Sequence, residues 1–214
     1  TGGGKTEVEF QLIRSRFFDH GDDTIVLVAP TIDLLRQHHA YFERFGLFHR
    51  DQVAVLHFRT GDEARADAFI DYAQTTDEDN FVRVMANNTA KKVLIFVTYA
   101  SEEKMFGIAE RRQIPLDLCV WDEFHNTVRQ DIDYREHLIN LPVQRNAFFS
   151  ASQKRGRIVS SFDEDIYGPV VAEVTYDELR KAGILVPRII VKPIRITTTS
   201  KRVRGIERDL RRAA

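Results

Sequence analysis

The sequence is short of cysteine, of long hydrophobic runs and of net charge, and each shortage excludes a class of protein. Cys119 is the only cysteine among 214 residues, which rules out an internal disulfide and predicts a reducing, cytoplasmic location. The longest apolar runs, at 25–30 and 93–97, are far shorter than the roughly 18 residues of a membrane-spanning helix, so no membrane partner is expected. Lysine and arginine number 31 against 32 aspartates and glutamates, a net charge of -1. This balance argues against a generally basic nucleic-acid-binding surface but leaves room for one local groove.

The composition of the chain is that of a folded domain, with 43% hydrophobic and 29% charged residues. Runs of β-branched and other apolar residues predict strands at 24–29, 53–58, 93–98, 116–121 and 146–150. Helical spacing of apolar residues predicts helices at 4–18, 31–46, 62–72, 102–112, 132–138 and 176–182. The polar stretch 75–80 is expected to be a surface loop, and 188–198 to be extended. The alternation of strands and helices predicts an α/β fold with a mainly parallel sheet and helices on both faces.

The first motif is Gly2-Gly3-Gly4-Lys5-Thr6, which opens the first predicted helix. Glycines let backbone N–H groups approach a phosphate closely, and a helix N-terminus adds positive dipole character. In this pattern Lys5 contacts the β- and γ-phosphates of a nucleotide, and the Thr6 hydroxyl binds Mg²⁺. The full pattern begins with a glycine that would precede Thr1, so we expect part of the protein to lie upstream. The alternative is a flexible glycine-rich loop without a ligand.

The second motif is Asp122-Glu123-Phe124-His125, at the end of the strand expected at 116–121. A carboxylate at the carboxyl end of a buried parallel strand lies at the crevice where open α/β sheets bind their ligands. Asp122 is a candidate Mg²⁺ ligand, and Glu123 is a candidate base that deprotonates an attacking water. The alternative is a solvated acidic turn. The occurrence of both motifs in one α/β chain favours a nucleotide hydrolase.

In this order, the motifs resemble those of the first RecA-like motor domain of superfamily 2 helicases and translocases. The resemblance is strongest to the DEAD/DEAH-type ATPase subunits of restriction enzymes and to similar phage helicases, and it spans nearly the whole chain. Residues 1–6 resemble motif I, and 122–125 resemble motif II, with Phe124 where Ala or Cys is usual. Further similar segments are 28–37 (motif Ia), 59–61, 97–101 (T-x-Y-x-S), 150–152 (motif III, with Ser152 in place of Thr) and 176–187.

The resemblance implies a P-loop ATPase site that uses ATP and Mg²⁺. It assigns nucleotide binding to Gly2, Gly3, Gly4, Lys5 and Thr6, Mg²⁺ binding to Thr6 and Asp122, and catalysis to Glu123 as the base with Lys5 and Asp122. It assigns coupling between the nucleotide and nucleic-acid sites to His125, Ser150 and Ser152. It assigns the nucleic-acid-binding face to Pro30, Thr31, Arg59, Thr60, Gly61, Thr98 and Ser101, largely through hydroxyl and backbone N–H contacts with phosphates.

The resemblance also implies how the chain is organised and what it does. Residues 1–192 are expected to form the first RecA-like domain, and 193–214 the linker or the start of a second motor domain. That second domain and its arginine finger, worth roughly 10³–10⁵ in rate, are expected to lie outside the chain, so the chain alone should hydrolyse ATP weakly. The expected function is an ATP-hydrolysing helicase or translocase that acts on DNA, with RNA left open as the strand. The alternative, a P-loop NTP-binding module that needs no strand, is disfavoured by the segments at 30–31 and 98–101.

Other conspicuous residues are expected to be structural. Cys119 and Trp121 lie in a predicted strand and should pack in the core. His38 and His39 lie on a predicted helix without partners at metal-ligand spacing, so no metal site is expected there. His57 is expected to be a structural histidine, and the acidic runs at 77–79 and 163–165 to be solvated loops.

Overall fold

The computed structural model describes residues 4–48, 52–59, 73–87, 92–128, 135–151 and 163–183. The chain divides into two compact units, 1–174 and 175–214, and each is described by itself. The predictions of a helix at 62–72 and of an extended segment at 188–198 lie outside the described residues. None of the described helices combines the length and the apolar character that a membrane span requires.

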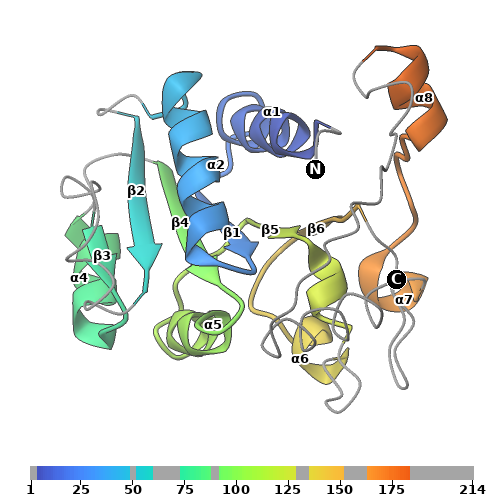
Figure 1. Ribbon diagram of the computed structural model, residues 1–214. Coiled ribbons are helices and arrows are strands. Elements are labelled where there is room, and N and C mark those ends of the chain that lie inside the picture. The colour runs from blue at the N-terminus through green and yellow to red at the C-terminus, as the bar shows by residue number, and fades with distance from the viewer. Residues whose placement is uncertain are drawn as a thin grey trace, which may run out of the picture. The chain divides into compact units, whose positions relative to one another are not determined.

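In the described part of the first unit, six strands form one parallel sheet in the order β3-β2-β4-β1-β5-β6 (Figure 1). The strands are β1 (Thr24–Ala29), β2 (Val53–Phe58), β3 (Ala73–Thr75), β4 (Lys92–Thr98), β5 (Leu118–Asp122) and β6 (Asn146–Phe149). The register places Val26 of β1 between Ile95 of β4 and Cys119 of β5. These three central strands are buried almost throughout, as their continuous apolar runs predict.

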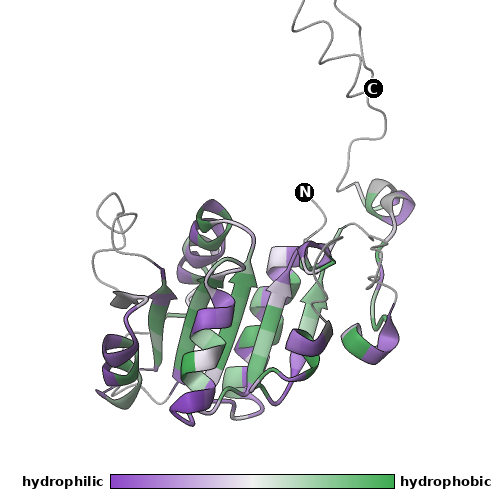
Figure 2. Cartoon of the chain, turned by 90° about the horizontal axis from the view of Figure 1, so that it is seen from below, coloured by the Kyte–Doolittle hydropathy of each residue, from purple (hydrophilic) through white to green (hydrophobic). Residues whose placement is uncertain are grey.

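Helices cover both faces of this sheet (Figure 1). On one face lie α1 (Lys5–Phe18) and α2 (Ile32–Arg44), and on the other lie α4 (Glu78–Asn87), α5 (Glu102–Arg111) and α6 (Arg135–Ile139). The side chains of β1 alternate between the two cores, Ile25 and Leu27 packing toward α1 and α2, and Val26 and Val28 toward α5. Figure 2 shows the result, hydrophobic strands between helices that turn hydrophilic residues outward. The predicted α/β fold, a parallel sheet with helices on both faces, is therefore confirmed.

The prediction of a surface loop at 75–80 is wrong, because this stretch holds the end of β3 and the first turn of α4. Asp77 caps the helix: its Oδ1 accepts a hydrogen bond from the Asn80 N–H, and its carbonyl accepts one from the Phe81 N–H, both at 2.9 Å. Phe81 is fully buried against Phe58, with ring centroids 5.4 Å apart. The acidic start is the polar first turn of an amphipathic helix, and the buried face comes only after it.

A second acidic run was also expected to be a loop, and part of it is helical. The short helix α7 (Glu164–Tyr167) begins inside 163–165, although the side chains of Glu164 and Asp165 are exposed as expected. The other elements predicted within the described residues are present, some of them with shifted ends. The expected strand at 116–121 begins at Leu118, and the expected helix at 132–138 is described from Arg135.

In the second unit, the described residues form the helix α8 (Tyr176–Lys181), as the sequence predicts. Thr175 and Glu178 make a capping box: the Thr175 N–H donates to Glu178 Oε2 at 2.7 Å, and the Glu178 N–H donates to Thr175 Oγ1 at 3.3 Å. The division of the chain into functional domains 1–192 and 193–214 stays a prediction.

An ion cluster around the buried carboxylate of Asp22 lies at the amino-terminal end of the sheet. The guanidinium of Arg16 donates two hydrogen bonds of 2.8 Å to the Asp22 carboxylate, and Arg145 donates a third of 2.9 Å. Burial by itself would raise the pKa of Asp22, but the hydrogen bonds and charges of the two arginines outweigh it and lower that pKa. Asp22 therefore joins the end of α1, the start of β1 and the residue before β6.

Replacing Asp22 by asparagine should lower the free energy of unfolding by about 1–3 kcal/mol at neutral pH, because charge-assisted hydrogen bonds are lost from a buried site. Since the pKa of Asp22 is lower in the folded state, its stabilisation is complete above the unfolded-state pKa of about 4 and is lost as the pH falls through the lowered folded value. Denaturation curves at neutral and acidic pH measure the free energy of unfolding of both proteins. The difference between the variant and the unmodified protein should shrink in acid, and Asp19→Asn, on an exposed residue nearby, should show little loss at either pH. A difference that stays constant with pH would contradict the assignment.

Candidate nucleotide site and strand-binding edge

The predicted site residues in the described part of the chain gather where the strands end. Because all six strands are parallel, their carboxyl ends share one edge of the sheet, which is where open α/β sheets bind ligands. The residues that end or directly follow these strands are Pro30 and Thr31 (β1), Arg59 (β2), Thr98 (β4), Asp122 and Glu123 (β5) and Ser150 (β6). Thr60, Gly61 and Ser152 lie outside the described residues.

Lys5 and Thr6 form the first turn of α1, directly after Gly4. Gly4 has a φ of 78°, in the left-handed region that side-chain-bearing residues rarely adopt. The first N–H groups of a helix have no intrahelical acceptor, so this turn presents hydrogen-bond donors and the positive end of the helix dipole. These are the features that a phosphate group requires. Gly2 and Gly3 lie outside the described residues.

The ammonium group of Lys5 lies between the two carboxylates of the second motif. Lys5 Nζ donates to Asp122 Oδ1 at 2.9 Å and also forms an ion pair with Glu123 Oε1. Burial by itself lowers the pKa of Lys5, but the hydrogen bonds to Glu123 and Asp122 and their charges outweigh it and raise that pKa. The structure thus joins the two motifs, which are 117 residues apart in the sequence, into one charged site.

The backbone at Glu123 is strained. Its φ of 51° and ψ of 46° are in the left-handed region, which is uncommon for a residue that is not glycine. Such conformations cost of order 1–3 kcal/mol and cluster at functional sites. Glu123 directly follows β5 and precedes the short 3₁₀ helix η1 (Phe124–Asn126). The turn at this residue places the Glu123 carboxylate against Lys5.

Two predicted coupling residues meet the other oxygen of Glu123. His125 Nδ1 lies 2.7 Å from Ser150 Oγ and 3.2 Å from Glu123 Oε2, and the Ser150 hydroxyl lies 3.5 Å from the same carboxylate oxygen. The hydroxyl that directly follows β6 therefore reaches the candidate base both directly and through His125. The structure brings these residues together, and their role in coupling stays a prediction.

The candidate strand-binding residues differ in exposure. Thr31 is exposed and caps α2, its hydroxyl accepting from the Leu34 N–H at 3.3 Å. Ser101 is half-buried and precedes α5, while the side chains of Thr98 and Arg59 are buried. Thr31 and Ser101 are thus the described hydroxyls best placed to reach a strand, and the nucleic-acid role of the whole set stays a prediction.

Three further residues contact the motif II aspartate or its backbone, and the sequence reading assigned them no function. The Tyr99 hydroxyl donates to the Asp122 carbonyl at 2.9 Å, and burial raises the pKa of Tyr99, which keeps it a donor. His38 Nε2 lies 2.7 Å from Glu9 Oε2 and 3.7 Å from Asp122 Oδ2. Glu9 follows Lys5 by four residues, a spacing that places two residues on one helix face. This spacing was the sequence signal that Glu9 lies near the site of Lys5.

Glu9 and His38 form a buried group with Asp122, in which ligand-type atoms of the three residues all lie within 4.8 Å of one another. The sequence offers His38 no partner at metal-ligand spacing, because Glu9 and Asp122 come from other elements of the fold. The expectation that no metal binds there stays a prediction. Burial raises the pKa of Glu9, and for His38 the opposing effect of burial is outweighed by the hydrogen bond and charge of Glu9, so the pKa of His38 is raised too.

The residues expected to be structural are packed in the core. Cys119 and Trp121 are fully buried in β5, as predicted. His57 is buried, stacks on Phe96 with ring centroids 4.9 Å apart, and lies 3.0 Å from His39 through Nε2 and Nδ1. Burial lowers the pKa of His39 to about 4, so this ring is neutral at physiological pH.

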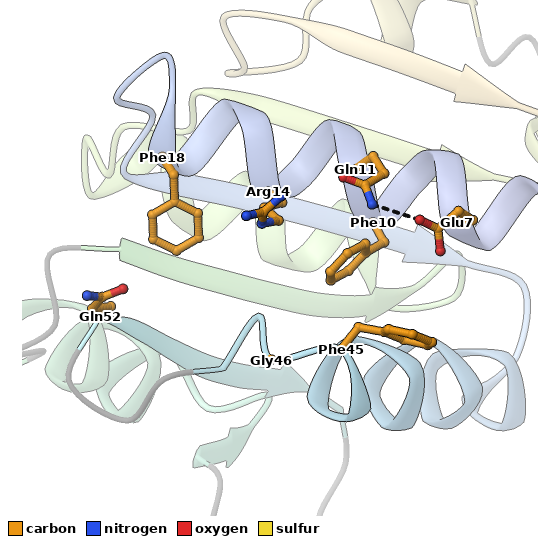
Figure 3. A pocket seen from close by; sticks show the side chains of 8 residues that line it. All are labelled: Glu7, Phe10, Gln11, Arg14, Phe18, Phe45, Gly46 and Gln52. Atoms are coloured by element: carbon orange, nitrogen blue, oxygen red, sulfur yellow. Dashed lines mark hydrogen bonds between the residues drawn. The ribbon is translucent and has the colours of Figure 1, made fainter.

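A separate groove of about 420 Å³ lies between α1 and the segment that follows α2 (Figure 3). It is lined by Glu7, Phe10, Gln11, Arg14, Phe18, Phe45, Gly46 and Gln52. None of the predicted site residues lines it. The candidate site at the carboxyl edge is therefore distinct from this groove.

A comparison with protein families matches residues 1–152 to the family described as "Type III restriction enzyme, res subunit". The chain belongs to this family. The match runs from the phosphate loop to the residues after β6, so it contains the complete candidate site. A comparison with curated proteins finds no match. Together with the fold, membership of this family confirms the predicted identification as a superfamily 2, RecA-like motor domain.

Two solved structures share this fold. One is a nuclease-deletion mutant of the Type ISP restriction-modification enzyme LlaGI in complex with a DNA substrate mimic, with a TM-score of 0.70 and 21% identity. The other is the ATP-dependent Type ISP restriction-modification enzyme LlaBIII bound to DNA, with a TM-score of 0.64 and 17% identity. The similarity covers 86% and 85% of this chain but only 16% and 14% of theirs, so the chain spans a small part of either enzyme's length.

The residues at the carboxyl edge fit a nucleotide with Mg²⁺. The Thr6 hydroxyl and the Asp122 carboxylate are the hard oxygen ligands that Mg²⁺ prefers. The ammonium group of Lys5 is a positive charge of the kind that phosphate oxygens require, and its partners in the structure are the carboxylates of Asp122 and Glu123. A phosphate group can therefore replace those carboxylates as the partner of the ammonium group without leaving a charge in an apolar site.

Proposed function

We propose that this chain is the ATP-binding motor domain of a DNA-dependent ATPase that translocates along DNA or unwinds it. The observation that carries the proposal is the ion-paired group Lys5, Asp122 and Glu123, at the edge of the sheet that also presents Thr31 and Ser101. One edge of one domain thus holds both phosphate-binding chemistry and hydroxyls suited to a strand. This proximity supports a motor more than an isolated nucleotide-binding module.

In the proposed site each residue has a distinct task. Lys5 exchanges its carboxylate partners for the β- and γ-phosphates, while the N–H groups of the first turn of α1 bind phosphate oxygens. Thr6 and Asp122 hold Mg²⁺, which when bound neutralises charge that develops on the phosphates. Glu123, released by Lys5, accepts a proton from the attacking water. Since His125 and Ser150 hold its second oxygen, Glu123 stays oriented when Lys5 leaves it.

The proposed strand is DNA, held through its phosphates. Hydroxyl and backbone N–H groups at Thr31, Ser101 and the neighbouring positions bind phosphates without reading sequence, which agrees with the net charge of -1. DNA is favoured over RNA because both structural neighbours are restriction-modification enzymes described with DNA or a DNA mimic. A second RecA-like domain with an arginine finger, outside residues 1–192, would complete the ATPase site.

Strand affinity in different nucleotide states tests this function in the full-length protein. A motor must couple the two sites, so the affinity for fluorescein-labelled single-stranded or duplex DNA should differ between the ATP-bound and ADP-bound states. Fluorescence anisotropy of the Glu123→Gln variant, with ATP or with ADP, measures the difference. Equal affinity in both states, or no strand binding at all, would favour the non-motor module. Stronger coupling to RNA than to DNA would replace the proposed substrate.

A further inference from the structure

Beneath the proposed magnesium ligand lies a hydrogen-bonded pair that the ATPase reaction itself does not use. Glu9 of α1 and His38 of α2 are 0% and 2% exposed, and they meet at 2.7 Å next to the carboxylate of Asp122. We propose that His38 is a positioning residue that fixes the Asp122 carboxylate and makes its placement depend on helix α2. The proposal rests on the proposed function, because Asp122 matters here as the Mg²⁺ ligand.

Both nitrogens of the His38 ring are engaged, which holds the ring in one orientation. Nδ1 donates to the Leu34 carbonyl at 2.7 Å, one turn earlier in α2. Nε2 faces Glu9 Oε2 at 2.7 Å and Asp122 Oδ2 at 3.7 Å. Asp122 is held on its other side by Lys5, which contacts Oδ1 at 2.9 Å. When Lys5 turns to a phosphate, His38 still contacts the carboxylate of Asp122, and Tyr99 still contacts its carbonyl.

Stability alone does not account for this pair. A buried carboxylate is costly unless it is fully hydrogen-bonded, and Glu9 Oε1 has no hydrogen-bond partner within the described part of the chain. The neighbouring positions Phe10 and Ile13 of α1 are apolar and buried, so an apolar residue would suit the same core. A carboxylate at this position instead binds His38 and keeps it against Asp122.

The contact between His38 and Asp122 also connects helix α2, which begins at the proposed strand-binding edge, with the proposed Mg²⁺ ligand. Thr31 caps α2, its hydroxyl and carbonyl accepting from the N–H groups of Leu34 and Leu35 at 3.3 and 3.1 Å. The Leu34 carbonyl in turn accepts from His38. About two turns of helix thus join a residue proposed to bind the strand to one that touches Asp122. A shift of α2 when a strand binds at Thr31 would move His38 with it, because a short helix moves as a rigid element.

A resident metal ion is the competing explanation of the same three residues. The separation of 2.7 Å between His38 Nε2 and Glu9 Oε2 is that of a hydrogen bond. Two ligands of a tetrahedral ion at about 2.0–2.1 Å from the metal would stand farther apart than this. The geometry therefore favours a direct hydrogen bond, and metal analysis of the purified protein distinguishes the two. Stoichiometric zinc or manganese without nucleotide, lost in His38→Leu, would overturn the positioning role.

The test compares His38 variants of different reach in the full-length protein. His38→Leu removes the polar group that contacts Asp122, and His38→Asn replaces it with an amide that is too short to reach Asp122. His38→Gln keeps a hydrogen-bond donor of sufficient length. We expect the first two to weaken Mg²⁺-dependent ADP binding, measured by calorimetry, by about 10-fold or more, the effect usual for residues that orient metal ligands. ADP affinity without Mg²⁺ should not change, and His38→Gln should restore most of the loss. DNA stimulation of the ATPase should fall in parallel.

His39→Leu is the matched control, because His39 is the next residue of α2, is equally buried and packs against His57 and Phe96 instead of Asp122. It should cost stability but leave Mg²⁺ dependence and DNA stimulation unchanged. If His38→Leu does not fold, the comparison of His38→Asn with His38→Gln gives the same answer. Unchanged Mg²⁺ dependence in a folded His38→Leu or His38→Asn would overturn the inference. Absence of DNA-stimulated ATPase in the unmodified protein would instead overturn the proposed function, so the two failures are distinguishable.

Discussion

Replacing Lys5 by alanine should abolish measurable ATP binding, because the affinity for ATP should fall by roughly 100-fold or more. The substitution removes charge-assisted hydrogen bonds to phosphate oxygens, each worth about 1.5–3 kcal/mol. It also leaves the carboxylates of Asp122 and Glu123 without the ammonium group that separates them, so the negative charge of the site would repel the nucleotide. Calorimetric titration with a non-hydrolysable ATP analogue measures the affinity directly.

The matched control for this substitution is Lys104→Ala, which removes an exposed lysine from the solvent side of α5. It should leave the affinity unchanged. Thermal unfolding of both variants separates a binding defect from a folding defect, because Lys5→Ala should stay folded around an intact sheet. ATP affinity that is the same in Lys5→Ala and in the unmodified protein would contradict the assignment of residues 2–6 as a phosphate loop.

Replacing Glu123 by glutamine should separate binding from chemistry. The amide keeps the size of the side chain and can still hydrogen-bond to His125 and Ser150, but it cannot accept a proton from water. ATP affinity should therefore be close to normal, while kcat falls by about 10²–10⁴, the usual contribution of a general base. Single-turnover hydrolysis and equilibrium binding, measured on the same preparation, give the two quantities.

Glu103→Gln controls for the loss of one negative charge, because Glu103 is an exposed glutamate in the first turn of α5. It should hydrolyse ATP at the normal rate. A Glu123→Gln protein with full turnover would remove Glu123 as the base. Loss of binding together with hydrolysis would mean that Glu123 serves mainly to support the phosphate loop through Lys5.

The parts of the fold that could be predicted are those in which one local pattern decides the structure. The runs 25–29 and 93–97 are apolar at every position, as expected for strands covered on both faces, and both belong to central strands of the sheet. Both strands also end at the predicted residues, Ala29 and Thr98. Because parallel strands share an edge, the meeting of Lys5 with Asp122 and of Ser150 with His125 followed from the motif order.

The parts that could not be predicted depend on contacts between distant segments. The acidic start of α4 gives a loop-like pattern, and its helical character becomes evident only when Phe81 is seen buried against Phe58. Likewise, Glu9 and His38 are 29 residues apart, and neither has a partner at ligand spacing in the sequence. Their contact results from the packing of α1 against α2 over β5, which local periodicity does not encode.

The central claim is that this domain drives an ATPase that DNA controls. The most direct measurement is the steady-state rate of ATP hydrolysis by the full-length protein without nucleic acid, with single-stranded or duplex DNA, and with RNA. We expect a several-fold stimulation by DNA that exceeds the effect of RNA and disappears in Glu123→Gln. Equal rates with and without any strand would contradict it.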